Sequence, residues 1–545
     1  MHGLMMQRPL LISQILEFAA GNYPDQEIVS RTTEGPIHRY TYPELAQRTR
    51  KLANALKKLG VTEEDRIGTI AWNTYRHLEV YYASSGMGAI CHTMNPRLPA
   101  EQFIYIINHA KDKFIFVDLT FLPLMEKLHE HFPDVEGYIV MTDEEHMPQT
   151  DLPRVYCYET LIKDEPDQFD WPEFDENTAS SLCYTSGTTG NPKGVLYSHR
   201  SNVLHALFAL TVSGLPLDER STILPVVPMF HVNAWGTPYF GLIAGTKLVF
   251  PGPGLDGENL ANLIEDEKVT DAWGVPTVWL GLLGYMKKAG KKFSTLQRTL
   301  IGGSAVPRSM IEDFRDNFGV EAIQGWGMTE MSPLGTVATP RPSQREGDWS
   351  EELRLRASQG RLVFGVEMKI VDAEGKELPH DGESQGELLV RGNAVISGYY
   401  ENPEATKKAL DKDGWFHTGD VSVITPDGFM EIVDRVKDVI KSGGEWISSI
   451  DLENEAIAHP GLAEAAVIGV RHEKWQERPL LVAVKNEDAD VTREDVLKFL
   501  EERGVAKWWL PDDVVFVDEL PHGATGKLQK AKLRDDFKDY RLPTE

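Results

Sequence analysis

The chain has 545 residues, a length that predicts more than one domain and enough buried volume for a large core. With 56 Lys and Arg against 83 Asp and Glu, the formal net charge is −27, which argues against nucleic acid or an anionic membrane as the main partner. The three cysteines, Cys91, Cys157 and Cys183, have no metal-ligand spacing and argue against a disulfide framework or a zinc site.

The N-terminal residues Met1 to Arg8 contain no long apolar run behind a basic stretch, so we expect no signal peptide. A membrane-spanning helix needs about 18 or more consecutive apolar residues, and no stretch of the sequence meets that length. We therefore expect a cytoplasmic protein without a transmembrane segment.

Helical and strand patterns alternate from the N-terminus to about residue 330. Residues 9–20 predict an amphipathic helix, and Thr41 with Glu44 forms a capping box that opens a second helix ending at Gly60. Short apolar runs at 114–117 and 138–140 predict strands. This alternation predicts a layered α/β architecture.

Residues 184–194 form a loop rich in groups that can bind an anion, between strands predicted at 180–184 and 195–197. Its hydroxyl side chains, glycines and lysine are Thr185, Ser186, Thr188, Thr189, Gly187, Gly190, Gly194 and Lys193. Glycines leave backbone N–H groups free to face a phosphate, and a lysine adds a point charge. A flexible surface turn is the alternative, although such turns seldom combine so many donors with a lysine. Pro192 excludes a Walker A loop, because it stands where that motif needs its second glycine.

The loop instead resembles the phosphate-binding loop of the adenylate-forming enzymes, which include acyl-CoA synthetases, luciferases and peptide-synthetase adenylation domains. The resemblance implies a large N-terminal multi-sheet α/β domain at residues 1–433 and a small mobile C-terminal α+β domain at residues 434–545. It also implies two reactions: transfer of AMP from ATP to a carboxylic acid with Mg²⁺, then transfer of the acyl group to coenzyme A.

The segment 223–235 resembles the second core motif of this family, in which a histidine, here His231, lies near the acyl carboxylate. A histidine at the end of an apolar run is otherwise usually structural. Trp235 follows four residues later, so the two side chains would meet if this turn were helical. In related fatty-acyl-CoA synthetases a tryptophan here gates the acyl tunnel; the alternative is an aromatic residue of the core.

Two further glycine-containing segments resemble the adenine pocket of the family. The predicted contacts are Gly302, Gly303 and Ser304 as the wall under adenine, followed by Gln324, Gly325, Trp326 and Gly327. Trp326 replaces the tyrosine usual in the family, and either ring can stack on adenine. By resemblance, Thr329 donates to the α-phosphate, while Glu330 and Thr185 hold Mg²⁺.

Residues 341–358 are polar and predict a surface excursion. Asp420 ends a motif whose aspartate accepts the ribose hydroxyls in the family. The following charged segment resembles the family's domain boundary, with Asp434 as the hinge and Arg435 reaching the ribose. The resemblance further implies nucleotide contacts from Lys437, Lys441 and Trp446, and a coenzyme A side at Ser442, Gly443 and Gly444.

The remaining chain predicts a compact unit, with strands at 465–470, 480–484 and 514–517 and a capped helix at 492–500. Lys527 matches the adenylation lysine of the family, although His522 stands where an arginine or lysine is usual. The predicted catalytic groups are thus Lys527, His231, Thr329 and Glu330.

Several short strings resemble bacterial medium- and long-chain fatty-acyl-CoA synthetases, among them residues 8–12, 228–235 and 442–449. We therefore predict a fatty-acid–CoA ligase that forms a homodimer through its N-terminal domain. Two alternatives remain open: an aryl or short-chain acid–CoA ligase of the same fold, and a non-catalytic acyl-nucleotide binding protein.

Overall fold

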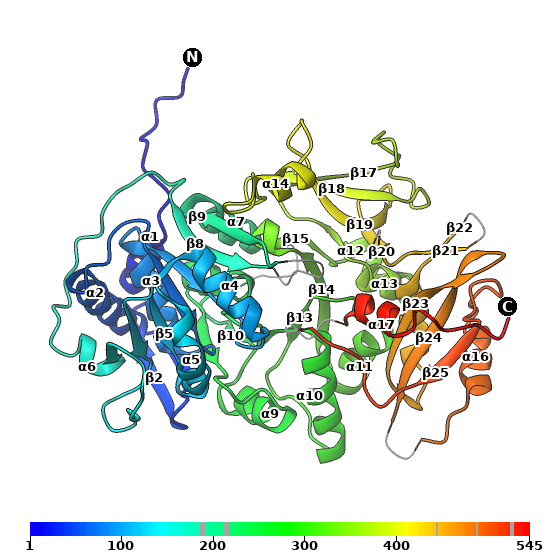
Figure 1. Cartoon of the computed structure of the whole chain (residues 1–545), viewed down its shortest axis with the longest axis horizontal. Coiled ribbons are helices and arrows are strands. Elements are labelled where there is room, and N and C mark those ends of the chain that lie inside the picture. The colour runs from blue at the N-terminus through cyan, green and yellow to red at the C-terminus, as the bar shows by residue number, and fades with distance from the viewer. Residues whose placement is uncertain are drawn as a thin grey trace.

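The computed structural model describes residues 1–185, 191–211, 217–435, 437–442, 445–486, 489–523 and 528–544, with the backbone alone at residues 445 and 446. A large N-terminal α/β part and a smaller C-terminal part lie beside each other (Figure 1).

Two large sheets form the N-terminal part. In spatial order, the nine-stranded sheet contains β16 (Arg361–Leu362), β15 (Leu334–Val337), β14 (Glu321–Gly327), β13 (Arg298–Ile301), β12 (Asp271–Gly274), β10 (Thr222–Pro225), β11 (Lys247–Phe250), β1 (Glu27–Arg31) and β2 (Ile37–Thr41). The seven-stranded sheet contains β7 (Val155–Cys157), β6 (Gly137–Val140), β5 (Asp112–Val117), β3 (Arg66–Ile70), β4 (Ile90–Thr93), β8 (Ala179–Tyr184) and β9 (Gly194–Ser198). Their inner strands are parallel, and antiparallel pairing is confined to the ends.

Two smaller sheets follow in the chain. The first is antiparallel, in the order β17 (Val366–Val371), β18 (Gly386–Gly392), β19 (Phe416–Ile424) and β20 (Met430–Arg435). The second contains β22 (Glu445–Ile447), β21 (Ile440–Ser442), β24 (Gln476–Lys485) and β23 (Leu462–His472), with β25 (Asp513–Phe516) pairing parallel to β24.

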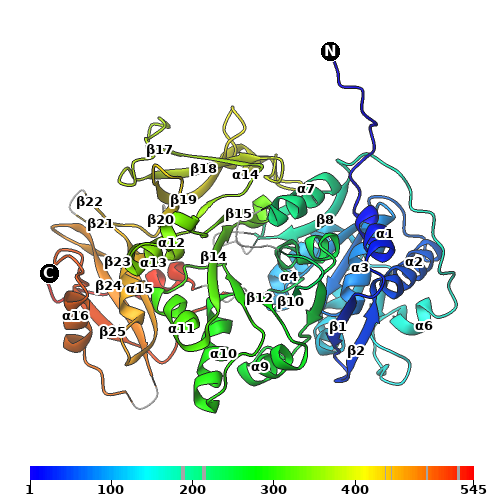
Figure 2. The same ribbon diagram turned by 180° about the vertical axis from the view of Figure 1, so that it is seen from behind.

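Helices cover the faces of these sheets (Figures 1 and 2). Those of the N-terminal part are α1 (Ile12–Asn22), α2 (Tyr42–Lys58), α3 (Tyr75–Gly86), α4 (Ala100–Ala110), α5 (Leu122–Leu128), α6 (Tyr158–Ile162), α7 (His199–Leu210), α8 (Thr237–Ile243), α9 (Gly257–Asp266), α10 (Pro276–Ala289), α11 (Arg308–Phe318), α12 (Pro342–Arg345), α13 (Trp349–Ala357) and α14 (Pro403–Ala409). The C-terminal part has α15 (Ser449–Ile457), α16 (Arg493–Glu502) and α17 (Lys530–Asp536). Short helical turns are η1 (Leu119–Phe121), η2 (His129–His131), η3 (Val232–Gly236) and η4 (Thr329–Met331).

Helix α3 lies between the two large sheets, and every one of its 12 residues is buried. The outer face of the nine-stranded sheet packs against α9, α10 and α11, and that of the seven-stranded sheet against α4 and α5. A helix buried on all sides fits only such a central layer. The N-terminal part is therefore layered, as predicted. The C-terminal residues from Ile440 onward have hydrophobic clusters of their own.

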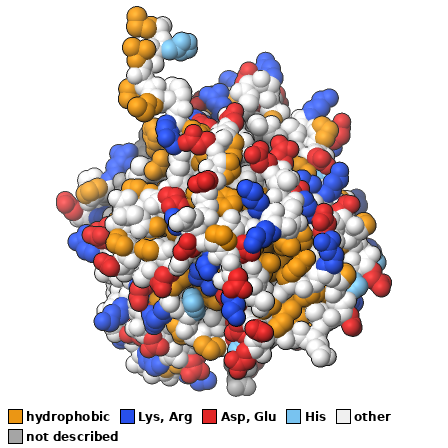
Figure 3. Space-filling view, turned by 90° about the vertical axis from the view of Figure 1, so that its left-hand side faces the viewer, with side chains coloured by type: hydrophobic (Ala, Val, Ile, Leu, Met, Phe, Trp, Pro, Cys, Tyr) orange, Lys and Arg blue, Asp and Glu red, His pale blue; other side chains and the backbone are white. Residues whose placement is uncertain are grey.

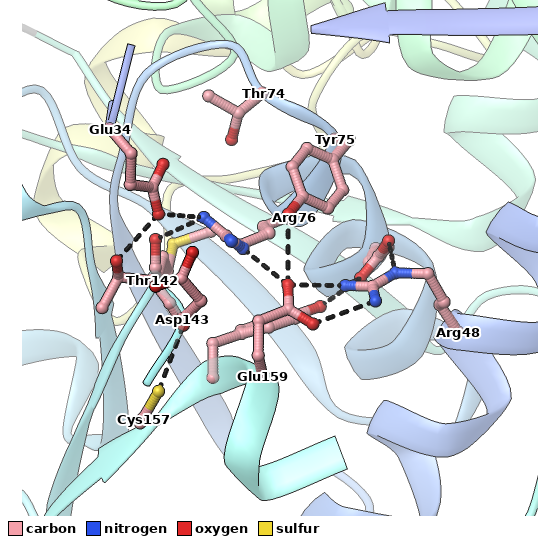
Figure 4. Close-up of polar contacts among 12 residues, drawn as sticks. Glu34, Arg48, Thr74, Tyr75, Arg76, Thr142, Asp143, Cys157 and Glu159 are labelled. Atoms are coloured by element: carbon pink, nitrogen blue, oxygen red, sulfur yellow. Dashed lines mark hydrogen bonds and ion pairs between the residues drawn. The ribbon is translucent and has the colours of Figure 1, made fainter. Parts of the chain in front are cut away.

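A network of buried charges fastens the loop after β1 to α2, α3 and α6 (Figure 4). Arg76 binds Glu34 at 2.7 Å and Glu159 at 2.8 Å, while Arg48 binds Glu159 at 2.9 Å and Glu79 at 2.7 Å. The side chains of Arg76, Glu34 and Glu79 are at most 7% exposed. Because each buried charge has an opposite partner, the network is stable only as a set.

One expectation about local structure was wrong, and the condition stated for a contact between His231 and Trp235 is not met. Residues 341–358 are not only a surface excursion, because they contain α12 and α13. Helix α13 packs on α11: Leu355 is 1% exposed, and Arg315 of α11 is stacked over the ring of Trp349. The turn after His231 is not a right-handed helix, because residues 232–235 all have positive φ, between 43° and 58°.

Residues 1–9 form no helix or strand, and the tail projects from the surface with Met1, Leu4, Met5 and Met6 exposed (Figure 3). Within the described part of the chain, no helix is long and apolar enough to cross a membrane.

Candidate active site

The two described ends of the predicted phosphate loop are fastened to each other. Strands β8 and β9 pair up to Tyr184 and Gly194 at one edge of the seven-stranded sheet. Beyond that pair, the Thr185 N–H donates to the Lys193 carbonyl at 2.9 Å, and the Lys193 N–H donates to Thr185 Oγ1 at 3.4 Å. The predicted contacts Ser186, Gly187, Thr188, Thr189 and Gly190 lie outside the described residues.

Tyr399 connects this loop to Glu330. The ammonium group of Lys193 lies 4.8 Å from the centre of the Tyr399 ring, and the Tyr399 hydroxyl donates to Glu330 Oε1 at 2.8 Å. Next to it, the Tyr400 N–H donates to the Gly194 carbonyl at 2.9 Å. Sequence reasoning missed Tyr399, because no local pattern shows that it meets a carboxylate 69 residues away.

Thr329 and Glu330 begin the short turn η4 and are 8% and 7% exposed. The hydroxyl of Tyr197 on β9 donates to the Thr329 carbonyl at 2.6 Å, and the Ile396 N–H donates to the Glu330 carbonyl at 2.9 Å. Both backbone carbonyls are thus fixed by residues far away in the chain. The structure brings Thr185, Lys193 and Glu330 into one cluster.

The donor set of this cluster suits Mg²⁺. Within the described residues, no group of three or more His, Cys, Asp or Glu side chains could form a metal cage. Mg²⁺ commonly binds through one or two carboxylates and substrate phosphates while it keeps several waters. Glu330, beside a loop with a lysine and a threonine, fits that kind of site.

The predicted adenine wall is formed by two close backbone segments. A Cβ atom at Gly302 would lie 2.8 Å from the Gly325 carbonyl oxygen and 3.1 Å from the Trp235 ring, so only glycine fits. Gln324 is buried, and its Oε1 accepts the Val306 N–H at 3.1 Å, which holds the turn after Gly302. Gly303 and Ser304 are exposed at this turn, and Gly327 lies directly against the backbone of residue 333.

Asp420 contacts two other residues that are predicted to bind the nucleotide. The indole N–H of Trp326 donates to Asp420 Oδ2 at 3.3 Å, and Arg435 Nε lies 3.4 Å from Asp420 Oδ1. Asp420 and Arg435 face each other on β19 and β20. The Trp326 indole therefore orients the carboxylate predicted to accept the ribose hydroxyls, a contact the sequence did not indicate.

His231 lines a small cavity with Asn95 and with Tyr184, the first residue of the predicted phosphate loop. The segment before it is held by Asn73, whose side chain donates to the carbonyls of residues 225 and 227 at 2.8 Å and accepts the Met229 N–H at 2.6 Å. Sequence reasoning missed Asn73. The structure thus brings His231 to the loop.

The left-handed turn at 232–235 aims the Trp235 ring at Gly302. Left-handed backbone costs roughly 1–2 kcal/mol per residue other than glycine. Tertiary contacts hold the turn here: Asn233 accepts from the Tyr81 hydroxyl at 3.2 Å and donates to Ser181 Oγ at 3.3 Å. A right-handed turn would lose these contacts.

The structure does not bring all the predicted residues of the C-terminal part to this cluster. Lys437 and Lys441 are exposed, and Ser442 is buried, where its hydroxyl accepts from Arg478 at 3.2 Å. Asp434 accepts the Ser449 N–H at 2.8 Å. Gly443, Gly444 and Lys527 lie outside the described residues, as does the side chain of Trp446.

Comparisons with known proteins find relatives over nearly the whole chain. The family model for "AMP-binding enzyme" matches residues 16–400, and that for "AMP-binding enzyme C-terminal domain" matches residues 451–527. The chain is 53% identical to a 3-methylmercaptopropionyl-CoA ligase of Ruegeria lacuscaerulensis, over 99% of both chains. It is 52% identical to a medium-chain-fatty-acid–CoA ligase of Ectopseudomonas oleovorans, over 99% of this chain and 98% of that one. A crystal structure of the anthranilate CoA ligase AuaEII in complex with anthranoyl-AMP superposes with a TM-score of 0.86 at 26% identity, covering 97% of this chain and 98% of that one.

Proposed function

Because this chain belongs to the AMP-binding enzyme family and is an acyl-CoA ligase that uses ATP, coenzyme A and Mg²⁺, we propose that its acid is a medium- or long-chain fatty acid. The 52% identity to a medium-chain-fatty-acid–CoA ligase over 99% of the chain supports this proposal. The single structural observation behind it is the Trp235 ring, which lies against Gly302 where a gate between acyl and adenylate sites would stand.

The first half-reaction joins the acid to AMP. A carboxylate oxygen of the acid attacks the α-phosphorus of ATP, the bond to pyrophosphate breaks, and acyl-AMP forms. We propose that Thr185 and Lys193 bind the phosphates and that Thr329 donates to the α-phosphate. Glu330 and Thr185 would hold Mg²⁺, which would neutralise charge on the phosphates.

The nucleoside is proposed to lie between the Gly302 wall and Trp326, with its ribose hydroxyls on Asp420. Trp326 and Arg435 already hold that carboxylate in place, so binding requires little rearrangement. His231 is proposed to lie by the acid carboxylate, since it faces the cavity beside Tyr184.

In the second half-reaction the thiol sulfur of coenzyme A attacks the acyl carbon, AMP leaves, and the thiol proton is released. We propose that residues 434–545 rotate about Asp434 between the two steps, because Lys527 must withdraw to admit the thiol. On this proposal Lys437, Lys441 and the segment 442–446 approach the site in one of the two positions.

A panel of acids tests the substrate. Straight-chain acids from four to 16 carbons, 3-methylmercaptopropionate and an aromatic acid would be compared by pyrophosphate release in the presence of ATP. We expect the highest kcat/KM at medium or long chains. The 53% identity to a 3-methylmercaptopropionyl-CoA ligase favours that short acid as the second candidate, and a maximum there would overturn the fatty-acid proposal.

Lys527→Ala tests the two-step scheme. The variant should lose acyl-AMP formation, about a hundred- to a thousandfold in rate, because one preorganised positive group is removed from the transition state. It should still convert supplied acyl-AMP and coenzyme A to the thioester. An equal fall in both half-reactions would contradict the role assigned to Lys527. The expected homodimer and cytoplasmic location stay predictions, the former open to analytical ultracentrifugation.

A further inference from the structure

The cations of α17 are connected to the carboxylate of the proposed hinge and to one that follows it in the chain. Lys530 and Arg534 lie one helical turn apart on α17, and Asp438 follows the proposed hinge residue Asp434 by four positions. Arg534 pairs directly with Asp438, while Lys530 reaches Asp434 through Ser449. In Figures 1 and 2, α17 lies on the side of the C-terminal part that faces the N-terminal part.

The contacts around Lys530 are short and buried. Its ammonium group donates to Ser449 Oγ at 2.5 Å and lies 2.8 Å from Glu453 Oε1. Ser449 in turn donates its hydroxyl to Asp434 Oδ2 at 2.5 Å and its backbone N–H to the same oxygen at 2.8 Å. The side chain of Lys530 is 11% exposed, and Asp434 and Ser449 are 1% and 0% exposed.

The charges in this cluster support one another. Burial alone would lower the pKa of Lys530, but Glu453, Asp434 and Asp438 outweigh burial and raise it. Lys530 is therefore a fixed cation across the physiological range. A buried ammonium between carboxylates is strongly destabilised when one partner leaves, so this arrangement favours one relative position of Asp434 and α17.

The same helix follows directly on the segment that contains Lys527, three residues before Lys530 in the sequence. The described base of that segment is closed by the Gln529 N–H, which donates to the Pro521 carbonyl at 2.8 Å, and by the pairing of His522 with Leu528. The contacts that fix Lys530 against Asp434 therefore also fix the described residues that border the segment of Lys527.

We propose that Lys530 is a positioning residue for acyl-AMP formation, tying the segment of Lys527 to the hinge carboxylate Asp434 through Ser449. This inference rests on the proposed function, because it assigns Lys530 to one of the two proposed half-reactions. Lys530 has no role in thioester formation, for which Lys527 must leave the site. Neither the sequence motifs nor the comparisons distinguish Lys530 from other lysines of the small domain.

The test compares Lys530→Met with Lys530→Arg, using Lys532→Met as the matched control, since Lys532 is an exposed lysine on the same helix. Acyl-AMP formation would be followed by pyrophosphate–ATP isotope exchange without coenzyme A. The second half-reaction would be followed by thioester formation from supplied acyl-AMP.

We expect Lys530→Met to slow exchange at least about tenfold, as for loss of a hydrogen bond to a charged group, with thioester formation within about twofold of wild type. Lys530→Arg should restore most of the exchange rate, and Lys532→Met should change neither reaction. Ser449→Ala keeps the charge of Lys530 but removes the bridging hydroxyl, so it should give a smaller loss, confined to exchange. If Lys530→Met fails to fold, the result for Ser449→Ala tests the role of Lys530 in its place.

Equal losses in both half-reactions, or none in either, would overturn the role of Lys530. A wild-type enzyme that forms no acyl-AMP would instead overturn the proposed function, so the two failures are distinguishable.

Discussion

Replacing Tyr399 by phenylalanine would remove a single hydroxyl from the proposed nucleotide site and leave the ring that faces Lys193 in place. That hydroxyl donates to Glu330 Oε1 at 2.8 Å, and both residues are 7% exposed. Little space is left for a water molecule to take over the contact. The carboxylate would therefore lose a donor that fixes its orientation.

The magnitude follows from the charge on the acceptor. A hydrogen bond to a charged group contributes about 1.5–3 kcal/mol, which corresponds to about 10- to 150-fold in an equilibrium constant. Loss of a partner that orients a metal ligand typically costs about 10- to 100-fold in metal affinity or activity. We therefore expect Tyr399→Phe to raise the Mg²⁺ concentration for half-maximal acyl-AMP formation about 10- to 100-fold.

The assay is pyrophosphate release without coenzyme A over a series of Mg²⁺ concentrations. Tyr400→Phe is the matched control, because it removes the same atom from the adjacent residue, whose contact with Gly194 is made by its backbone. The rate of Tyr399→Phe should approach that of wild type at saturating Mg²⁺. If Tyr399→Phe and Tyr400→Phe needed the same Mg²⁺ concentration, Tyr399 would not orient a metal ligand.

Three other substitutions test separate parts of the structure. Arg76→Met should lower the free energy of unfolding, measured by urea denaturation, by about 3–5 kcal/mol, because it leaves Glu34 buried without its cation. Adding Glu34→Gln to this variant should recover part of the loss. Burial opposes ionisation of Glu34, but Arg76 and the Thr142 hydroxyl outweigh it and lower its pKa. The stability that ionised Glu34 contributes is thus present above its ordinary pKa of about 4.3 and lost in acid. The free energies of unfolding of the wild type and of Arg76→Met should therefore converge as the pH falls. Gly302→Ala should raise the KM for ATP about tenfold or more, because its Cβ would lie 2.8 Å from the Gly325 carbonyl oxygen. Gly281→Ala in α10 meets nothing within 4 Å and should instead stabilise the fold by about 0.5–1 kcal/mol. Trp326→Phe should raise the KM for ATP about tenfold, and an unchanged KM would separate the indole N–H from nucleotide binding.

The features predicted correctly are those that depend on neighbouring residues in the chain. The capping box of Thr41 and Glu44 is formed, with the Thr41 N–H donating to Glu44 Oε2 at 2.7 Å, and α2 follows it to Lys58. Thr492 likewise caps α16. Both signals act within one helical turn, so the sequence alone contains the whole interaction.

The failures occur where distant residues override local preference. The segment 232–235 has no glycine before Gly236, and its residues favour a right-handed turn. Contacts from Tyr81 and Ser181, on α3 and β8, hold it left-handed instead. The polar composition of residues 349–357 did not indicate α13, a helix whose Leu355 and Trp349 pack on α11. No sequence pattern within these two segments identifies the distant residues that they contact.

The same distinction separates the two kinds of residue in the site. Motifs point to the groups that we predict to face the substrates, such as Lys193, Glu330 and Asp420, because each chemistry needs a particular side chain. The groups that orient site residues are hydroxyls and N–H donors from elsewhere in the chain: Tyr399 on Glu330, Trp326 on Asp420, Tyr197 on the Thr329 carbonyl and Ser449 on Asp434. A tyrosine at any of many positions could supply such a hydroxyl, so its sequence context is uninformative. Because rate depends on placement within about an ångström, loss of one of these orienting residues should be measurable in activity even though none of them is predicted to touch a substrate.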